Sequence, residues 1–132
     1  LRSELVLFPS EEVKHSQIAE RARDRVRLLL ALEREGLLPP GMSADPASSV
    51  PVMTPELARA VHMYLARTPA ALLMVQLEDV LGEVDQINLP GTTSEYGNWR
   101  RKIALPLEGW NGDARFAQLC EALAATRDRV KG

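Results

Sequence analysis

Apolar residues recur every three or four positions in three segments of the chain, a spacing typical of helices that bury one face. It predicts helices over residues 10–35, 54–67 and 113–130. The residues expected to be buried are Ile18, Ala22, Val26, Leu29 and either Leu30 or Leu32 in the first helix, Leu57, Val61, Tyr64 and Leu65 in the second, and Phe116, Leu119, Cys120, Leu123 and Val130 in the third. The fold is therefore expected to be mainly α.

The predicted helix ends carry residues suited to them. Ser10, Thr54 and Asp113 each precede a helix, and their side-chain oxygens can accept hydrogen bonds from free N–H groups of the first turn. Pro55 follows at the first helical position, where its missing N–H costs nothing. Gly36 ends the first helix, because glycine readily adopts the left-handed backbone of a helix terminus.

The segments between the helices differ in composition. Residues 37–53 contain four prolines and predict a connecting loop, since proline lacks a backbone donor. Residues 70–77 form an apolar run interrupted only by Gln76, which predicts a buried strand of the kind found in parallel sheets. Periodicity by itself also fits a buried helix there. Residues 83–112 show no regular pattern and are expected to form a long loop.

Composition narrows the class of protein. Of the 132 residues, 45% are hydrophobic and 26% are charged, as in globular domains. A net charge of −2 argues against nucleic-acid binding, and the longest apolar run, residues 70–75, is too short to cross a bilayer. Without a signal sequence and with a single cysteine, Cys120, the chain is expected to be cytoplasmic. Because it begins at Leu1 rather than Met, we expect a fragment.

The usual signatures of catalytic centres are missing from the sequence. His15, His62 and Cys120 are too dispersed to predict a metal site, and neither a nucleophile-elbow nor a phosphate-loop motif occurs. We expect His15 on an exposed face, His62 on the side of the second helix and Cys120 as an apolar filler. Glu78 and Asp79 end the predicted strand, where barrel enzymes place working groups, but a helix or turn cap is the favoured interpretation.

The segment from Asn88 to Lys102 combines side-chain amides, an aromatic ring and guanidinium groups. Amides can bond sugar hydroxyls and the indole of Trp99 can stack on a pyranose, so sugar binding is one interpretation. In the structural alternative, Trp99 is buried and an arginine pairs with an acid near the strand end. The candidate pairs join Arg100 or Arg101 to Glu78, Asp79 or Glu83. A nucleic-acid surface has less support, since the rest of the chain adds no positive charge.

Three motifs stand out in the second half of the chain: Leu77 to Gly82, Gln86 to Thr92, and Tyr96 to Lys102. Together they resemble the carboxy-terminal signature of the family 77 glycoside hydrolases, the 4-α-glucanotransferases. Two upstream segments, Leu5 to Ser10 and Thr54 to Glu56, are similar to the same region of the longer enzymes of this family.

The resemblance implies a (β/α)8 barrel. Residues 1–132 would be a single carboxy-terminal α/β piece of it, mainly α with one or two short strands, and the eighth barrel strand would lie near Ala71 to Leu77. Enzymes of this family transfer α-1,4-glucan segments between maltooligosaccharides with retention, using a nucleophile, an acid/base carboxylate and a third aspartate. The resemblance implies no metal or organic cofactor. The implied partners are α-1,4-glucans, with neither nucleic acid nor membrane.

The family's catalytic residues are not matched in this chain. The third aspartate belongs to a His-Asp motif, whereas here His15 is followed by Ser16 and His62 by Met63. We therefore expect no catalytic residue, the acids at the end of the predicted strand included, and no activity of the chain alone. The resemblance assigns the following residues to substrate binding: Asn88 as a ligand of a sugar hydroxyl, and Pro90, Gly91, Asn98 and Trp99 as the wall that shapes the site.

A further expectation concerns assembly. A barrel strand without its neighbours would expose backbone groups and apolar surface, which predicts self-association. The alternatives to a piece of an enzyme are a non-catalytic helical interaction module and a stand-alone glucan-binding domain.

Overall fold

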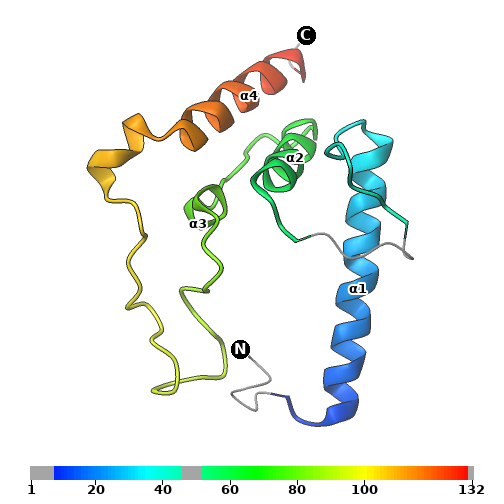
Figure 1. Ribbon diagram of the computed structural model, residues 1–132, viewed down its shortest axis with the longest axis vertical. Coiled ribbons are helices and arrows are strands. Elements are labelled where there is room, and N and C mark those ends of the chain that lie inside the picture. The colour runs from blue at the N-terminus through cyan, green and yellow to red at the C-terminus, as the bar shows by residue number, and fades with distance from the viewer. Residues whose placement is uncertain (1–7, 46–51, 131–132) are drawn as a thin grey trace.

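In the computed structural model, residues 8–45 and 52–130 are described, with the backbone alone for residues 128–130. Within these ranges the chain forms four α-helices and one 3-10 helix, and no strand (Figure 1). They are α1 (Glu11–Arg34), α2 (Pro55–Ala66), α3 (Leu77–Leu81), η1 (Leu107–Gly112) and α4 (Ala114–Val130). The expectation of a mainly α fold is confirmed. Part of the apolar segment before Ser10 and residues 46–51 of the proline-rich loop lie outside the described residues.

Short-range hydrogen bonds define the ends of the helices. The Ser10 hydroxyl accepts a bond from the Val13 N–H at 3.2 Å, and the Thr54 hydroxyl does the same for the Leu57 N–H at 3.2 Å. At the end of α1, Gly36 has φ 64°, and the bond from the Leu37 N–H to the Leu32 carbonyl at 2.8 Å closes a Schellman motif. These ends depend on residues within one turn, which is why the sequence indicates them.

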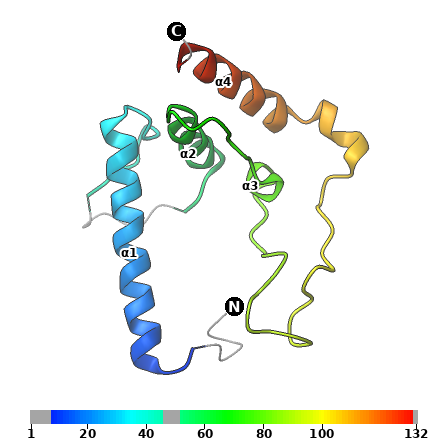
Figure 2. The same cartoon turned by 180° about the vertical axis from the view of Figure 1, so that it is seen from behind.

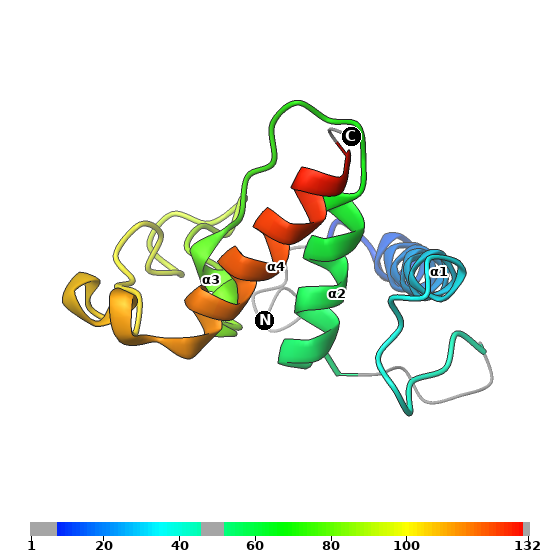
Figure 3. The same cartoon turned by 90° about the horizontal axis from the view of Figure 1, so that it is seen from above.

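The core lies where the second half of α1 meets α2. Leu29 and Leu32 of α1 are buried with Leu57 and Ala60 of α2 and with Ala44 from the intervening loop. On its other side α2 packs against α4, which crosses it in the view from above (Figure 3). Apolar burial at these helix faces holds the helices together.

Several residues of the predicted apolar stripes are not buried. Ile18 is 56% exposed, because the first half of α1 extends beyond the other helices (Figure 2). On α2, Leu65 is 41% exposed while His62 is buried, with its Nδ1 2.8 Å from the Ala58 carbonyl oxygen. Cys120 is exposed rather than acting as an apolar filler. Ala22 is also exposed, whereas His15 is exposed as expected.

The predicted strand is wrong for the residues that the structure describes. Residues 70–76 have an irregular backbone and α3 begins at Leu77, so the segment is neither a strand nor a buried helix. A strand requires a neighbour for its backbone groups, and the described part of the chain supplies none. Leu72 and Met74 are 86% and 91% exposed. The Arg127 guanidinium donates to the carbonyls of Ala70 and Ala71, at 2.8 and 3.1 Å, and anchors the start of the segment.

The chain exposes more surface than a compact protein of its size. Its accessible surface is 9889 Å², whereas a compact monomer of this mass is expected to expose about 6,900 Å². None of the helices in the described ranges is long and apolar enough to cross a membrane.

Candidate functional site

The long segment after α3 is an ordered loop with two limbs. Residues 83–106, called the site loop below, descend from α3, turn, and return to η1 (Figure 1). The turn is Leu89-Pro90-Gly91-Thr92, in which the Thr92 N–H donates to the Leu89 carbonyl at 3.2 Å. Gly91 has φ 90°, the value that the third position of a type II turn requires, and Pro90 suits the second position. Two of the residues expected to shape a sugar site thus form its turn.

Asn98 connects the two limbs through its side-chain amide. Its Oδ1 accepts a bond from the Leu89 N–H at 2.7 Å, and its Nδ2 donates to the Thr92 hydroxyl at 2.9 Å and the Thr92 carbonyl at 3.2 Å. One residue later, the Trp99 N–H donates to the Ile87 carbonyl at 2.9 Å. Both ends of the Asn98 amide are therefore used inside the loop.

Trp99 is displayed on the surface. Its side chain is 75% exposed, so the alternative in which this indole is buried is wrong. Its φ of 59° lies in the left-handed region, which a bulky residue rarely occupies. Strained residues of this kind persist only where the surrounding structure holds them, and they are concentrated at functional sites. Here the backbone bonds to Ile87 and from Arg100 to Gly97 hold the conformation.

Sequence reasoning missed the residues that support the site loop from within. Leu89 is 1% exposed and Tyr96 is 8% exposed, and the Tyr96 hydroxyl donates to the Gln86 carbonyl. The Thr92 hydroxyl donates to the Leu89 carbonyl at 2.7 Å. The signals were the Pro-Gly turn between Leu89 and Thr92 and the isolated aromatic residue Tyr96 in a polar stretch.

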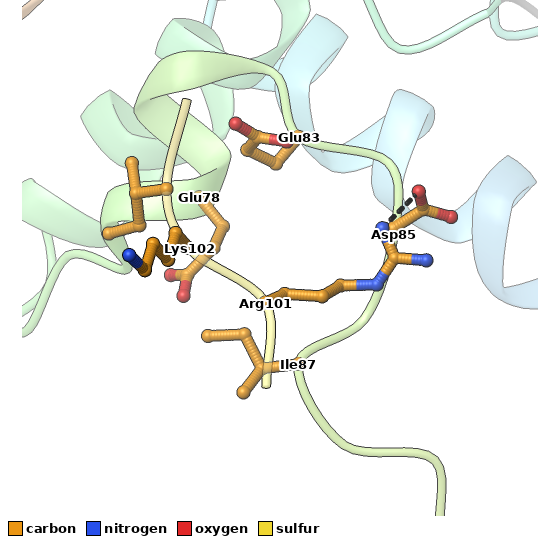
Figure 4. Close-up of a pocket in the computed structure, with 7 residues that line it drawn as sticks. Glu78, Glu83, Asp85, Ile87, Arg101 and Lys102 are labelled. Carbon is orange, nitrogen blue, oxygen red and sulfur yellow. Dashed lines mark hydrogen bonds and ion pairs between the residues drawn. The ribbon is translucent and has the colours of Figure 1, made fainter. Parts of the chain in front are cut away.

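A half-open cavity of 270 Å³ lies between the limbs of the site loop and α3 (Figure 4). Arg101 pairs with Asp85 across it, with Nη1 2.6 Å from Oδ2. The predicted partners of this arginine were the acids at positions 78, 79 and 83, and that part of the prediction is wrong. The Glu83 Oε1 instead accepts a bond from the Ala104 N–H at 3.1 Å. Glu78 lines the cavity.

The remaining acids have structural settings. Glu78 and Asp79 lie in the first turn of α3, where carboxylates are favoured by the helix dipole, and this helix start has no side-chain cap. At the start of α4, a side-chain hydrogen bond from Arg115 lowers the pKa of Asp113 from 3.8 to about 2. Across the described residues, no group of histidine, cysteine and acidic side chains could hold a metal ion.

Comparison with known proteins identifies the family. The 4-alpha-glucanotransferase family, glycoside hydrolase family 77, matches this chain over residues 12–107. The chain belongs to this family. A 4-alpha-glucanotransferase of Haemophilus influenzae is 40% identical over 96 residues, which are 73% of this chain and 13% of that protein. The proteins of the same name from Mycobacterium bovis and Mycobacterium tuberculosis are 42% identical over 113 residues, 80% of this chain and 14% of theirs.

Two facts about these relatives bear on function. The range that matches the family ends at residue 107, so it includes the whole turn of the site loop and Trp99. The chain, however, spans only 13% to 14% of the length of the curated relatives it matches.

Proposed function

We propose that this chain is the carboxy-terminal portion of a cytoplasmic, retaining 4-α-glucanotransferase and that its site loop contacts an α-1,4-glucan. The observation that carries the proposal is the display of Trp99, a 75% exposed indole on a strained backbone within a cross-linked loop. An exposed ring with one apolar face is suited to stacking on a pyranose. A loop backbone that is already held in place loses little freedom on binding.

Asn88 is the proposed ligand of a sugar hydroxyl. It directly precedes the turn and is half-buried, and among the described residues nothing bonds to its side-chain amide. An amide offers both donors and an acceptor to vicinal hydroxyls. Pro90, Gly91 and Asn98 would act through the shape of the loop, since Asn98 already uses both ends of its amide.

The placement in a (β/α)8 barrel is part of the proposal. The exposure of Leu72 and Met74 supports this placement, and so does the large accessible surface of the chain. Neighbouring elements of a barrel would cover such apolar surface. The catalytic carboxylates would come from those other elements, and no metal or organic cofactor would take part.

Calorimetric titration with maltoheptaose tests the sugar contacts. We expect saturable binding, weakened about threefold to tenfold by Trp99→Ala, the range for the loss of an aromatic contact. Asn88→Ala should also weaken it. Trp110→Phe is the matched control, because Trp110 stacks on Phe116 and donates to the Leu105 carbonyl at the end of the site loop, away from the turn. This change should leave the affinity unchanged. Failure of the unsubstituted chain to bind would overturn the proposed contact.

An activity assay tests the assignment of catalysis to other parts of the enzyme. Incubated with maltotriose, the 132-residue chain should release neither glucose nor longer dextrins. Sustained disproportionation of maltotriose would show that the catalytic carboxylates lie within this chain and would contradict the proposal.

Self-association of the isolated chain follows from the same surface. Leu72 and Met74 project from a segment whose described neighbours leave it uncovered. Sedimentation velocity should show dimers or larger species, and Met74→Lys should shift them toward the monomer. A concentration-independent monomer would contradict this expectation.

A further inference from the structure

The two limbs of the site loop are joined by an ion pair between Asp85 and Arg101. Asp85 lies on the descending limb, three residues before Asn88, and Arg101 lies on the returning limb, two residues after Trp99. Their side chains point toward one another across the opening of the cavity (Figure 4), with 2.6 Å between Nη1 and Oδ2. The pair thus closes the segment that carries both proposed sugar contacts.

Arg101 has a second contact on its own limb. Its guanidinium carbon lies 5.4 Å from the centre of the Tyr96 ring, within the range of a cation–π interaction. The Tyr96 hydroxyl donates in turn to the Gln86 carbonyl, next to Asp85. Two of these contacts, Arg101 with Asp85 and Tyr96 with Gln86, connect one limb to the other. Separating the limbs near positions 85 and 101 therefore breaks several linked interactions rather than a single pair.

The ion pair complements the hydrogen bonds nearer the turn. The bonds from the Trp99 N–H to Ile87 and from the Leu89 N–H to Asn98 hold the tip of the loop. Without a connection at positions 85 and 101, the bond from the Ala104 N–H to the Glu83 carboxylate remains nearer the open end, and separation of the limbs between it and the tip can strain the bonds at the tip. The spacing of Asn88 and Trp99 depends on those bonds being intact.

We infer that Asp85, Arg101 and Tyr96 form a clasp that positions Asn88 and Trp99 for glucan binding. The inference rests on the proposed function for its sugar-binding part. These three are positioning residues and do not themselves touch the sugar. The clasp increases the fraction of molecules in which the loop is closed and able to bind glucan. Its loss lowers the affinity because it reduces that fraction.

The size of the effect follows from the exposure of the pair. The side chains of Arg101 and Asp85 are 44% and 54% exposed, and exposed ion pairs change equilibria about twofold to fivefold. Loss of the ion pair in Asp85→Asn should therefore increase local opening of the loop by this factor. The helices should keep their stability.

Amide hydrogen exchange measured by NMR tests the clasp without any sugar. In Asp85→Asn, protection of the Leu89 and Trp99 amides should fall about twofold to fivefold, while the amides inside α2 keep their protection. Asp85→Glu, which retains the charge, should restore most of the protection. Equal loss of protection in the loop and in α2 would show global destabilisation and would overturn the inference.

Glu35→Gln is the matched control for removing a carboxylate. Glu35 pairs with Arg67 at 3.3 Å, with side chains 49% and 42% exposed, and this pair lies in the helical part of the chain. The substitution removes the same charge from an equally exposed pair. It should leave Leu89 and Trp99 protection unchanged, so a loss there would point to net charge rather than to the clasp.

Maltoheptaose titration of the same variants connects the clasp to binding. The dissociation constant should rise in Asp85→Asn by the same factor as loop opening and return toward that of the unsubstituted chain in Asp85→Glu. Unchanged exchange and unchanged affinity in Asp85→Asn would overturn the clasp. If the unsubstituted chain binds no glucan, the proposed function and the sugar-binding part of the inference fall, and the exchange data alone decide whether the clasp holds the loop.

Discussion

The helical part of the molecule and the site loop are held together by different forces. Where α1 meets α2, Leu32 and Leu57 are almost fully buried, and stability comes from apolar surface removed from water. In the site loop, by contrast, Asn98, Thr92 and the backbone supply a dense set of hydrogen bonds, and few side chains are buried. The helices can therefore tolerate polar changes at their surface, whereas the shape of the loop depends on individual polar groups.

The sharpest test of the helical part is Leu32→Ala. Leu32 has no exposed surface, and truncation of a buried leucine costs about 2–5 kcal/mol through lost burial and the cavity left behind. Urea unfolding followed by far-UV circular dichroism should show this loss. Ile18→Ala, on the same helix at a position 56% exposed, is the control and should change the free energy of unfolding by less than about 0.5 kcal/mol.

In the site loop, Asn98→Ala should have the largest local effect. It removes three hydrogen bonds and leaves the part-buried Leu89 N–H without its acceptor, which costs about 1–3 kcal/mol. Exchange of the Leu89 and Trp99 amides should accelerate while the urea midpoint of the helices moves little. Asn98→Asp keeps the acceptor for Leu89 but loses both donors, so its effect should be intermediate. A large fall in the helical midpoint would contradict the separation of the two regions.

Gly91→Ala tests the turn at the tip of the loop. Gly91 has φ 90°, which an alanine side chain disfavours, and the substitution should cost about 1 kcal/mol in the loop. Gly97→Ala is a matched control in the same loop, because a Cβ there meets nothing within 4 Å and no positive φ is required. Loop exchange rates should rise for Gly91→Ala alone, and equal rates in both variants would contradict the assigned turn.

The smallest effect is expected at the start of α4, where Asp113 lies between η1 and α4. Its carboxylate accepts bonds from the Arg115 N–H at 2.9 Å and the Arg115 side chain at 2.6 Å. Because these bonds lower its pKa from 3.8 to about 2, its contribution to stability is complete above pH 3.8 and is lost as the pH falls through about 2.

The difference in thermal midpoint between the unsubstituted chain and Asp113→Asn reports this contribution. It should be constant at pH 5 to 7 and shrink as the pH falls from about 3.8 toward 2. A difference that grows on acidification would contradict the assigned linkage.

Much of the local structure could be predicted from the sequence alone. Ser10, Thr54 and Asp113 mark helix starts, because a cap acts within three residues, and the Pro90-Gly91 pair defines a turn for the same reason. The family could be recognised too, since its motifs are continuous stretches of chain. Helix caps, turns and contiguous motifs can be predicted without knowing how the helices pack together.

Only the tertiary structure decided which faces are buried and how the site loop is displayed. Ile18, expected to be buried, is exposed, and His62, expected on the side of its helix, is buried, because burial depends on which helix packs against a face. Residues 70–76 form no strand, since pairing requires a second segment. The exposure of Trp99 likewise depends on how the two limbs of the site loop pack together. So does the pairing of Arg101 with Asp85, which lies 16 residues earlier in the sequence. Such long-range pairings are set by the geometry of the whole loop, which residue type and spacing do not specify.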